Sequence, residues 1–216
     1  MSRNKCLSPY QSLTGCTFQY HEFARVLPLL MADDAKLLMR EEIVHNRLLQ
    51  VNSETARRRF MSAFWSRYCA APRSLWEAFD TMSEQGRRAA LFYAILKESK
   101  LAFDFHFDIA VKHFHSVEAS VELNDIYMEI NDIASRDAFV DSWADSTKKK
   151  TASAYLTMLR QVGLLDAHSA ALKPLHLAPS DFAYYIRSGE EWFLEACLLY
   201  PYEIKNVKTD LSYDKQ

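Results

Sequence analysis

The chain has 216 residues and a formal net charge of −2 at pH 7; 49% of its residues are hydrophobic and 13% are aromatic. This composition excludes a disordered polypeptide and allows one large domain or two small ones. No apolar run reaches membrane-spanning length, and the first residues lack the apolar stretch of a signal peptide. We therefore expect a cytoplasmic protein that makes no contact with a membrane.

Turn-forming residues are rare and the charges are unevenly distributed. Only four glycines and six prolines interrupt long periodic segments, which favours an all-α fold, mainly a helical bundle, because sheets need many turns. The first 100 residues carry 15 Lys and Arg against 10 Asp and Glu, whereas residues 101–216 carry 11 against 18. A basic half beside an acidic half suggests a preferred binding side, with chance fluctuation of solvated charges as the alternative.

The start of the chain predicts three helices. Residues 21–31 are apolar enough for a short helix, with a kink or a late start at Pro28. Asp33 or Asp34 is a good N-cap for the second helix. Ser53 begins the third, which has one apolar face and carries three consecutive arginines on its other faces.

A short helix over residues 74–82 precedes a long helix that Ser83 caps. The long helix is apolar nearly all round at residues 89–96, so we expect it at the centre of the core. The helical pattern then continues to residue 116. We therefore expect an N-terminal helical domain over residues 1–116, which contains the arginine-rich helix.

The second half begins with a linker that ends at an N-cap, Asn124. Two helices are expected at residues 125–134 and 136–144. Ser146 is then expected to cap a third helix, which Gly163 ends because glycine tolerates the left-handed conformation that closes a helix.

Two short apolar pieces follow between residues 164 and 177, and one more helix is expected around residues 190–199. Two helices, a capped third helix and a short hairpin are the order of a winged helix-turn-helix unit. A plain helical hairpin with an irregular loop is an equally good interpretation. We therefore expect a C-terminal helical domain, winged-helix-like, over residues 117–216.

Motifs for catalysis are missing. The four glycines are too far apart for a phosphate-binding loop, a dinucleotide fingerprint or a nucleophile elbow. Ser146 and Lys149 have the spacing of a Ser/Lys hydrolase pair, but the serine is better interpreted as a helix cap. We expect no enzyme activity, no cofactor and no small-molecule substrate.

One stretch is rich in histidine: His106, His113 and His115 lie near Asp104 and Asp108. A metal site would need these side chains to converge on one helical face. Histidines of a core or a solvated surface are far commoner on an aromatic helix. We therefore expect no metal.

Two basic clusters occur near the N-termini of capped helices. Cationic side chains and helix N-termini both favour phosphate, so these clusters are candidate DNA contacts. The alternative is a solvated basic face on each helix. The candidate residues are Thr55, Arg57, Arg58 and Arg59 in the first cluster and Thr147, Lys148, Lys149 and Lys150 in the second, with Arg47 and Arg67 flanking.

The order and spacing of several segments resemble the BrxA family of bacterial BREX phage-defence systems. The matching segments are L-T-G-C (13–16), E-E-I-V-H-N-R-L-L-Q (41–50), S-E-T-A-R-R-R-F (53–60), L-F-Y-A-I-L-K-E-S-K (91–100), T-K-K-K (147–150) and M-L-R-Q-V-G-L-L (158–165). The resemblance implies a helical, non-enzymatic protein that binds double-stranded DNA beside other BREX components. It places the two basic helices against DNA. The mildly acidic net charge is a departure from this pattern and does not favour strong non-specific binding.

A protein–protein adaptor is the alternative function. The aromatic residues of one segment could dock a larger partner, as could the acidic helices over residues 125–145. The aromatic residues in question are Phe103, Phe105, Phe107 and Phe114.

Overall fold

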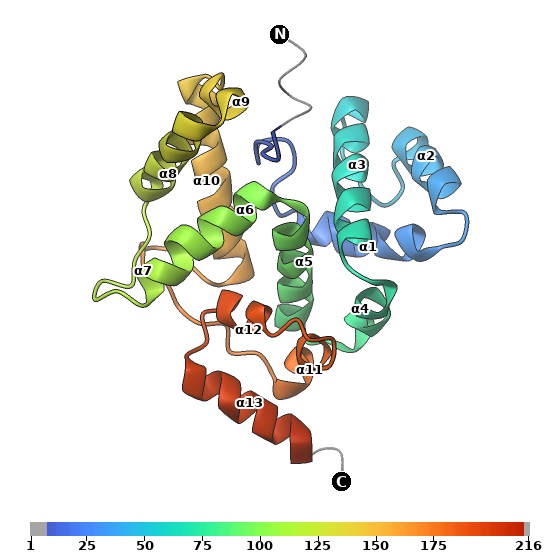
Figure 1. The fold of residues 1–216 in the computed structure, drawn as a ribbon. Helices are drawn as coiled ribbons and strands as arrows, with labels where there is room; N and C mark the ends of the chain where they lie inside the picture. The colour runs from blue at the N-terminus through green and yellow to red at the C-terminus, as the bar shows by residue number, and fades with distance from the viewer. Residues whose placement is uncertain (1–7, 214–216) are drawn as a thin grey trace.

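The computed structural model describes residues 8–213 and confirms the all-α fold. Figure 1 shows α5 (Glu84–Glu98) in the middle of the molecule, between α3 (Glu54–Ala70) and α10 (Asp145–Val162). Within the described residues there is no regular strand, only two isolated β-bridges. The other helices are α1 (Tyr20–Met31), α2 (Ala35–His45), α4 (Arg73–Ala78), α6 (Lys100–Asp104), α7 (Lys112–Phe114), α8 (Leu123–Arg136), α9 (Ala138–Asp141), α11 (Pro179–Arg187), α12 (Trp192–Ala196) and α13 (Pro201–Tyr213).

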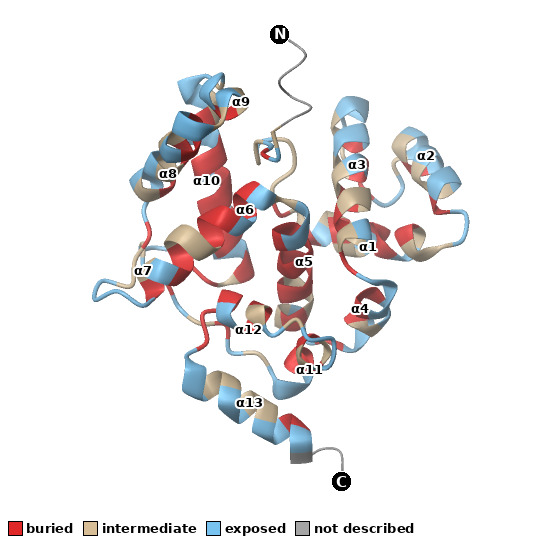
Figure 2. Cartoon of the chain, viewed as in Figure 1, coloured by how far each residue is buried: buried red, intermediate tan, exposed pale blue. Residues whose placement is uncertain are grey.

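Helix α5 forms the centre of the core, as its sequence predicts. The Ser83 hydroxyl accepts a hydrogen bond from the Gly86 amide and caps the helix. Every residue from 89 to 96 is buried, and Figure 2 shows buried residues on α5 and α10 alike. Burial on all sides accounts for the lack of a polar face in this stretch.

The helix that starts with α6 widens to a π-helical stretch, Phe105–Val111, before it ends as α7. His106 lies in this stretch and is fully buried. One ring nitrogen lies 2.9 Å from the Tyr155 hydroxyl and the other 2.7 Å from the Ala196 carbonyl oxygen. Burial lowers the pKa of His106 to about 4, so the ring is neutral near pH 7.

His106 is therefore a core histidine whose two nitrogens both have partners. Across residues 8–213, no group of three or more His, Cys, Asp or Glu side chains is placed to hold a metal ion. In the same described range, no helix is both long and apolar enough to cross a bilayer.

Several predicted helix boundaries are wrong. Helix α8 starts at a capping box between Glu122 and Asp125, so Asn124 is inside the helix and is not its cap. The N-cap of α10 is the extended residue Ala144, which places Ser146 in the first turn. Pro28 lies inside α1, and the helix predicted at 136–144 is only the short α9.

The end of the chain contains three helices where one was predicted. Helices α11 and α13 both begin at a proline, Pro179 and Pro201. Proline is favoured in the first turn of a helix because the amide that it lacks has no partner there. The sequence analysis expected one helix around residues 190–199 and so missed the two helix starts at these prolines.

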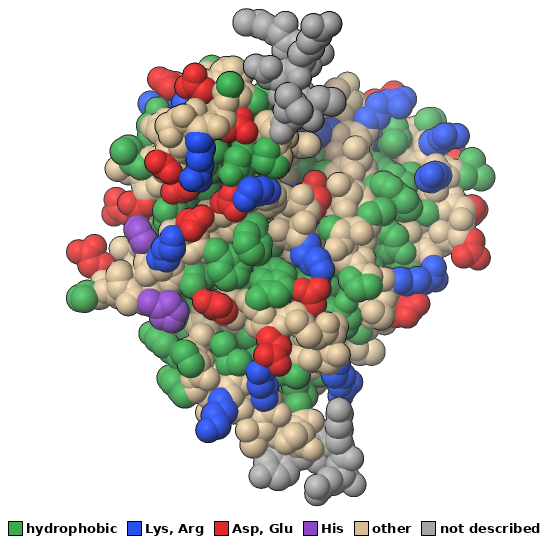
Figure 3. All heavy atoms as spheres, viewed as in Figure 1, with side chains coloured by type: hydrophobic (Ala, Val, Ile, Leu, Met, Phe, Trp, Pro, Cys, Tyr) green, Lys and Arg blue, Asp and Glu red, His purple; other side chains and the backbone are tan. Residues whose placement is uncertain are grey.

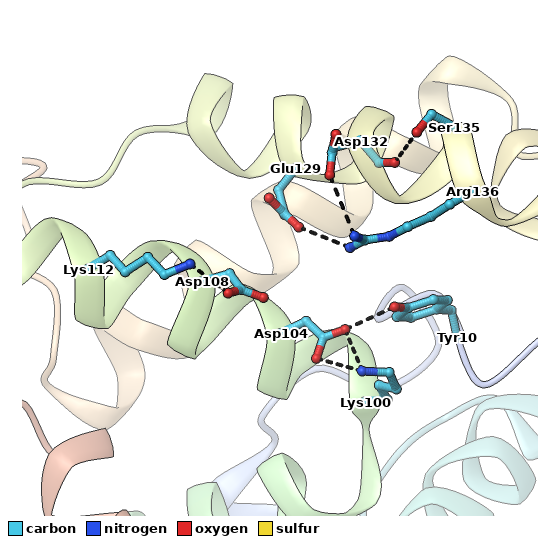
Figure 4. A network of polar contacts seen from close by, with 9 residues as sticks. All are labelled: Tyr10, Lys100, Asp104, Asp108, Lys112, Glu129, Asp132, Ser135 and Arg136. Carbon is cyan, nitrogen blue, oxygen red and sulfur yellow. Dashed lines mark hydrogen bonds and ion pairs between the residues drawn. The ribbon is translucent and has the colours of Figure 1, made fainter.

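One hydrophobic core extends across the boundary predicted between residues 116 and 117. Helix α10 packs on α5, and α8 and α12 pack on the π-helical stretch. Figure 4 shows polar contacts that lie within each predicted half, on either side of this boundary. Tyr10 donates to the buried Asp104 at 3.0 Å, and Lys100 donates to the same carboxylate at 2.8 Å. The two predicted halves share one core, and their division into separate domains stays a prediction.

Candidate nucleic-acid interface

The outward face of α10 is basic. From residue 146 to residue 162 the helix contains no Asp or Glu. Its exposed side chains include the cations Lys149, Lys150 and Arg160, with Ser153 and Thr157 between them. These positions repeat at helical spacing and so lie along one face. We call the five residues the α10 face.

Lys148 is not part of this face. It is buried, and its ammonium group donates to the Asn131 side chain of α8 at 3.2 Å. Thr147 is half-buried beside it. Of the three consecutive lysines in the sequence, the structure therefore presents only Lys149 and Lys150 to solvent.

A short hairpin follows α10. The Asp166 amide donates to the Ala171 carbonyl at 2.9 Å, and the Lys173 amide donates to the Leu164 carbonyl at 3.0 Å. The Asp166 carboxylate holds the tip by accepting the amides of His168 and Ser169 at 2.9 and 3.1 Å. We call residues 164–173 the wing. The second arm of the wing, residues 170–172, also pairs with residues 119–121, before α8.

Two of the predicted contact arginines are buried and bound to the backbone. Arg57 donates to the carbonyl oxygens of Ile43, Val51 and Asn52 at 2.7, 2.8 and 3.0 Å. Its guanidinium group therefore fixes the loop between α2 and α3. It is not displayed to a phosphate.

Arg67 binds the chain ahead of α1. Its guanidinium donates to the carbonyl oxygens of Phe18 at 3.0 Å, Cys16 at 2.7 Å and Thr17. Only 4% of Arg67 is exposed. This arginine therefore holds the lead-in segment, residues 8–19, against α3.

The other predicted residues on this side are exposed. Arg58 pairs with Glu54 at 2.5 Å, one helical turn away. Arg59 lies over the Phe60 ring and, within residues 8–213, has no carboxylate partner. Thr55 and Arg47 are exposed at the start of α3 and in the loop before it.

Helices α3 and α10 enclose a cleft. It has a volume of about 380 Å³ and is lined by Arg59 and Ser62 of α3, Glu98 of α5 and Met158 of α10. Figure 1 shows the lead-in segment between the two helices, both of which have their N-terminal ends at the top of that view. The two basic clusters therefore lie at the same end of the molecule.

The charges of the two sides differ. Figure 3 shows acidic side chains gathered over α8 and α9, whereas basic side chains prevail around α2 and α3. Arg160 and Lys173 are exposed cations that the sequence interpretation missed. Helical spacing from Lys149 would have identified Arg160, whereas Lys173 needed the pairing of the wing.

The described residues form an all-helical scaffold with exposed cations on two helices and a paired hairpin after one of them. These features define a helical protein with a basic surface. The BrxA family model matches residues 9–189, and the chain belongs to the BrxA family. It is 22% identical over 180 residues to the BREX protein BrxA of Escherichia coli O9:H4 (strain HS), which covers 83% of this chain and 84% of that protein.

The fold also matches a solved structure. The crystal structure of an uncharacterized protein from Magnetospirillum magneticum aligns with a TM-score of 0.75 and 22% identity. The alignment covers 88% of this chain and 98% of the other. At this identity the likeness defines the fold alone.

Proposed function

We propose that this protein is a non-enzymatic accessory component of a bacterial BREX anti-phage system and that it binds double-stranded DNA. The observation that carries the proposal is the α10 face, which presents Lys149, Lys150 and Arg160 with no carboxylate among them. Membership of the BrxA family and the likeness to a BREX protein support the system.

The arrangement around α10 supports a winged helix-turn-helix interpretation. Helix α8 packs on α10, and backbone hydrogen bonds with two isolated β-bridges join residues 119–121, 164–166 and 171–173 at the place that the sheet and wing take in such units. In such units the second helix of the pair enters the major groove. Here that helix is α10, and the acidic α8 and α9 would face away from the phosphates.

In this proposal the basic residues have two roles. Lys149, Lys150 and Arg160 contact phosphates and base edges from α10, and Thr147 supports the start of that helix. Thr55, Arg58, Arg59 and Arg47 supply additional phosphate contacts from the side of α3. Arg57, Arg67 and Lys148 act inside the fold, because each is buried and hydrogen-bonded there.

Fluorescence anisotropy with a labelled duplex of ~30 base pairs, at several salt concentrations, tests the proposal. Each phosphate contact that is lost lowers the slope of log K against log salt by ~0.9. Lys149/Lys150→Ala should therefore weaken binding and reduce the slope by up to ~1.8.

The matched control is Lys112/Lys205→Ala, which removes two exposed lysines from α7 and α13. It changes the net charge by the same amount and should leave most of the affinity. If both variants lose the same affinity, the duplex is attracted by the net charge of the protein and no defined interface binds it. Absence of duplex binding at low salt would remove the DNA function from the isolated chain.

A second candidate function is an adaptor that assembles BREX components without touching DNA. Phe103, which is 37% exposed, packs against Phe107 and Trp192 with ring centroids 4.6 and 5.7 Å away. Phe105 and Phe114 are buried and belong to the core. This function predicts that proteins from the native operon co-purify with the chain and that Phe103→Ser abolishes their co-purification.

A further inference from the structure

The cleft between α3 and α10 is too small for duplex DNA, yet large enough for a small organic molecule. Its volume of about 380 Å³ falls in the range of ligand pockets, ~300–1,000 Å³. Duplex DNA contacts outer faces and grooves, and it cannot enter a cleft of this size. Duplex binding by the α10 face therefore does not account for this cleft.

One wall of the cleft carries positive charge and hydroxyl groups. Arg59, Ser62 and Ser66 follow one another at helical spacing along α3. No hydrogen bond joins the hydroxyl of either serine to another described residue, and Arg59 has no carboxylate partner in residues 8–213. These groups are free to bind an anion.

Arg67 adds a buried positive charge to the same wall. It lines the cleft at 4% exposure, and its Nε has no hydrogen-bond partner among the described residues. Carbonyl oxygens of the lead-in segment accept from its other two nitrogens, but no carboxylate neutralises it there. A buried cation without a counter-charge is costly, so an anion in the cleft would lower that cost.

The charges of Arg67 and Arg59 also reach the thiol of Cys16. Burial raises the pKa of that thiol, whereas both guanidinium groups act to lower it. Among the described residues of the lining, Glu98 carries the single carboxylate. Two cations face one anion across the cleft, so its net charge is positive.

The opposite wall is apolar. Ala154 and Met158 of α10, together with Ile95 of α5 and Leu13 of the lead-in segment, present carbon and sulfur atoms to the cleft. A flat aromatic group packs well against such atoms, since the polarisable sulfur of methionine contacts aromatic rings favourably. A ligand for both walls needs an anionic group at one end and a flat apolar group at the other.

We propose that this cleft binds a phosphorylated nucleoside, with its phosphate on Arg59, Ser62 and Ser66 and its base between Leu13 and Met158. The site is distinct from the α10 face and accepts a ligand, with no chemical step. Because α3 and α10 form its walls, an occupied cleft fixes the spacing of the two helices on which duplex binding is proposed to depend.

Isothermal titration calorimetry of the full chain with adenosine monophosphate, adenosine and inorganic phosphate tests the proposal. The monophosphate should bind more tightly than either part alone. Arg59→Gln should weaken its binding about tenfold, the typical effect of one charge-assisted contact. Ser62→Leu, which fills the cleft and keeps the charge, should abolish it.

Arg58→Gln is the matched control, because Arg58 is the preceding residue and pairs with Glu54 outside the cleft. It should bind the monophosphate like the unmodified protein. Circular dichroism melts of all variants show whether each is folded. No binding of the monophosphate at millimolar concentration, equal binding of adenosine, or equal losses in Arg58→Gln and Arg59→Gln would each overturn the proposal.

Two sources of the same ligand chemistry can be separated by competition. If the 5′-phosphorylated end of an oligonucleotide displaces the monophosphate and a 5′-hydroxyl end does not, the site takes the end of a nucleic acid. If neither end displaces it, the ligand is a free nucleotide. Lys149/Lys150→Ala should keep monophosphate binding, so failure of duplex binding and failure of this site are distinguishable.

Discussion

At the scale of single residues, arginine has two separate tasks in α3. The sequence shows three identical side chains in a row, Arg57, Arg58 and Arg59, and gives no sign of which one is buried. The structure turns Arg57 inward to three backbone carbonyls and leaves its neighbours exposed. This inward position depends on residues outside α3: Ile43 in the last turn of α2 and Val51 and Asn52 in the following loop offer those carbonyls.

This difference predicts unequal effects on stability. Arg57→Ala should lower the free energy of unfolding by about 3 kcal/mol, because it leaves buried carbonyls without their charged donor. Arg58→Ala should cost about 0.5 kcal/mol, since an exposed pair one turn apart contributes little. Urea unfolding of both variants measures this. Similar losses would contradict the structural role of Arg57.

His106 predicts an acid-sensitive stability. Its folded pKa of about 4 lies below its ordinary value of 6.5, because burial disfavours the charged ring. The unfolded chain therefore binds a proton in this window that the folded chain does not. The stability is fully present above the ordinary pKa and is lost as the pH falls towards about 4.

The expected loss is at most about 1.4 kcal/mol per pH unit, and about 3 kcal/mol across the window. His106→Gln has no titrating ring, so its free energy of unfolding should fall less between about pH 7 and about pH 5. Denaturant unfolding at both pH values measures the two slopes. Equal slopes would show that His106 binds a proton while it is folded.

At the scale of elements, sequence patterns predicted the parts that depend on local rules. Serine caps located the starts of α3 and α5, and Gly163 ends α10 with the predicted left-handed conformation. Local rules were also misread where two candidate caps lie close together, as at α8, which Glu122 caps in place of Asn124. Periodicity alone also could not show that α8 covers Lys148.

The sequence likewise predicted only part of the candidate site. Lys149 and Lys150 could be found from the sequence as exposed cations at a helix start. The cleft could not, because its walls come from the lead-in segment, α3, α5 and α10, which are distant from one another in the chain. Arg67 was assigned to DNA for its charge, whereas its contacts are determined by a segment about 50 residues earlier.

The end of α10 gives a prediction at this scale. Gly163 has φ +100°, and a Cβ there would lie 2.8 Å from Nε2 of Gln85, whose amide donates to the Val162 carbonyl. Gly163→Ala should therefore destabilise the protein by about 2 kcal/mol, from backbone strain and crowding together.

Gly189 provides the control. Its φ is +74°, and a Cβ there meets nothing within 4 Å. Gly189→Ala should cost about 1 kcal/mol, from backbone strain alone. Thermal unfolding of the two variants measures the difference. If Gly189→Ala were the more harmful, crowding by Gln85 would not be the cause.

At the scale of the whole molecule, the C-terminal helices bind the two halves together. The Asp181 carboxylate of α11 accepts the Ser83 hydroxyl at 2.6 Å and its amide at 3.2 Å, at the start of α5. Lys97 of α5 pairs with Glu190, before α12, at 2.6 Å. With a shared core beneath these contacts, neither half has its apolar surface covered without the other.

We therefore predict that the chain unfolds in one cooperative step. Two tryptophans, Trp65 and Trp76, lie in the first half, and two, Trp143 and Trp192, lie in the second. Fluorescence and circular dichroism should give the same midpoint, and the calorimetric and van't Hoff enthalpies should agree. Two separate unfolding transitions would show that the halves on either side of residue 116 unfold as independent domains.

The lead-in segment has a consequence for how the protein is made. The hydroxyl of Tyr10 binds Asp104, 94 positions later in the chain. At a synthesis rate of ~5–20 residues per second, Tyr10 leaves the ribosome ~5–20 s before its partner does. The segment that closes one side of the cleft is thus translated before the residues that hold it, and it docks late. During that interval the segment has no surface to lie on and exposes Tyr10 and Phe18, which are buried in the folded protein, so the segment is where a chaperone would bind.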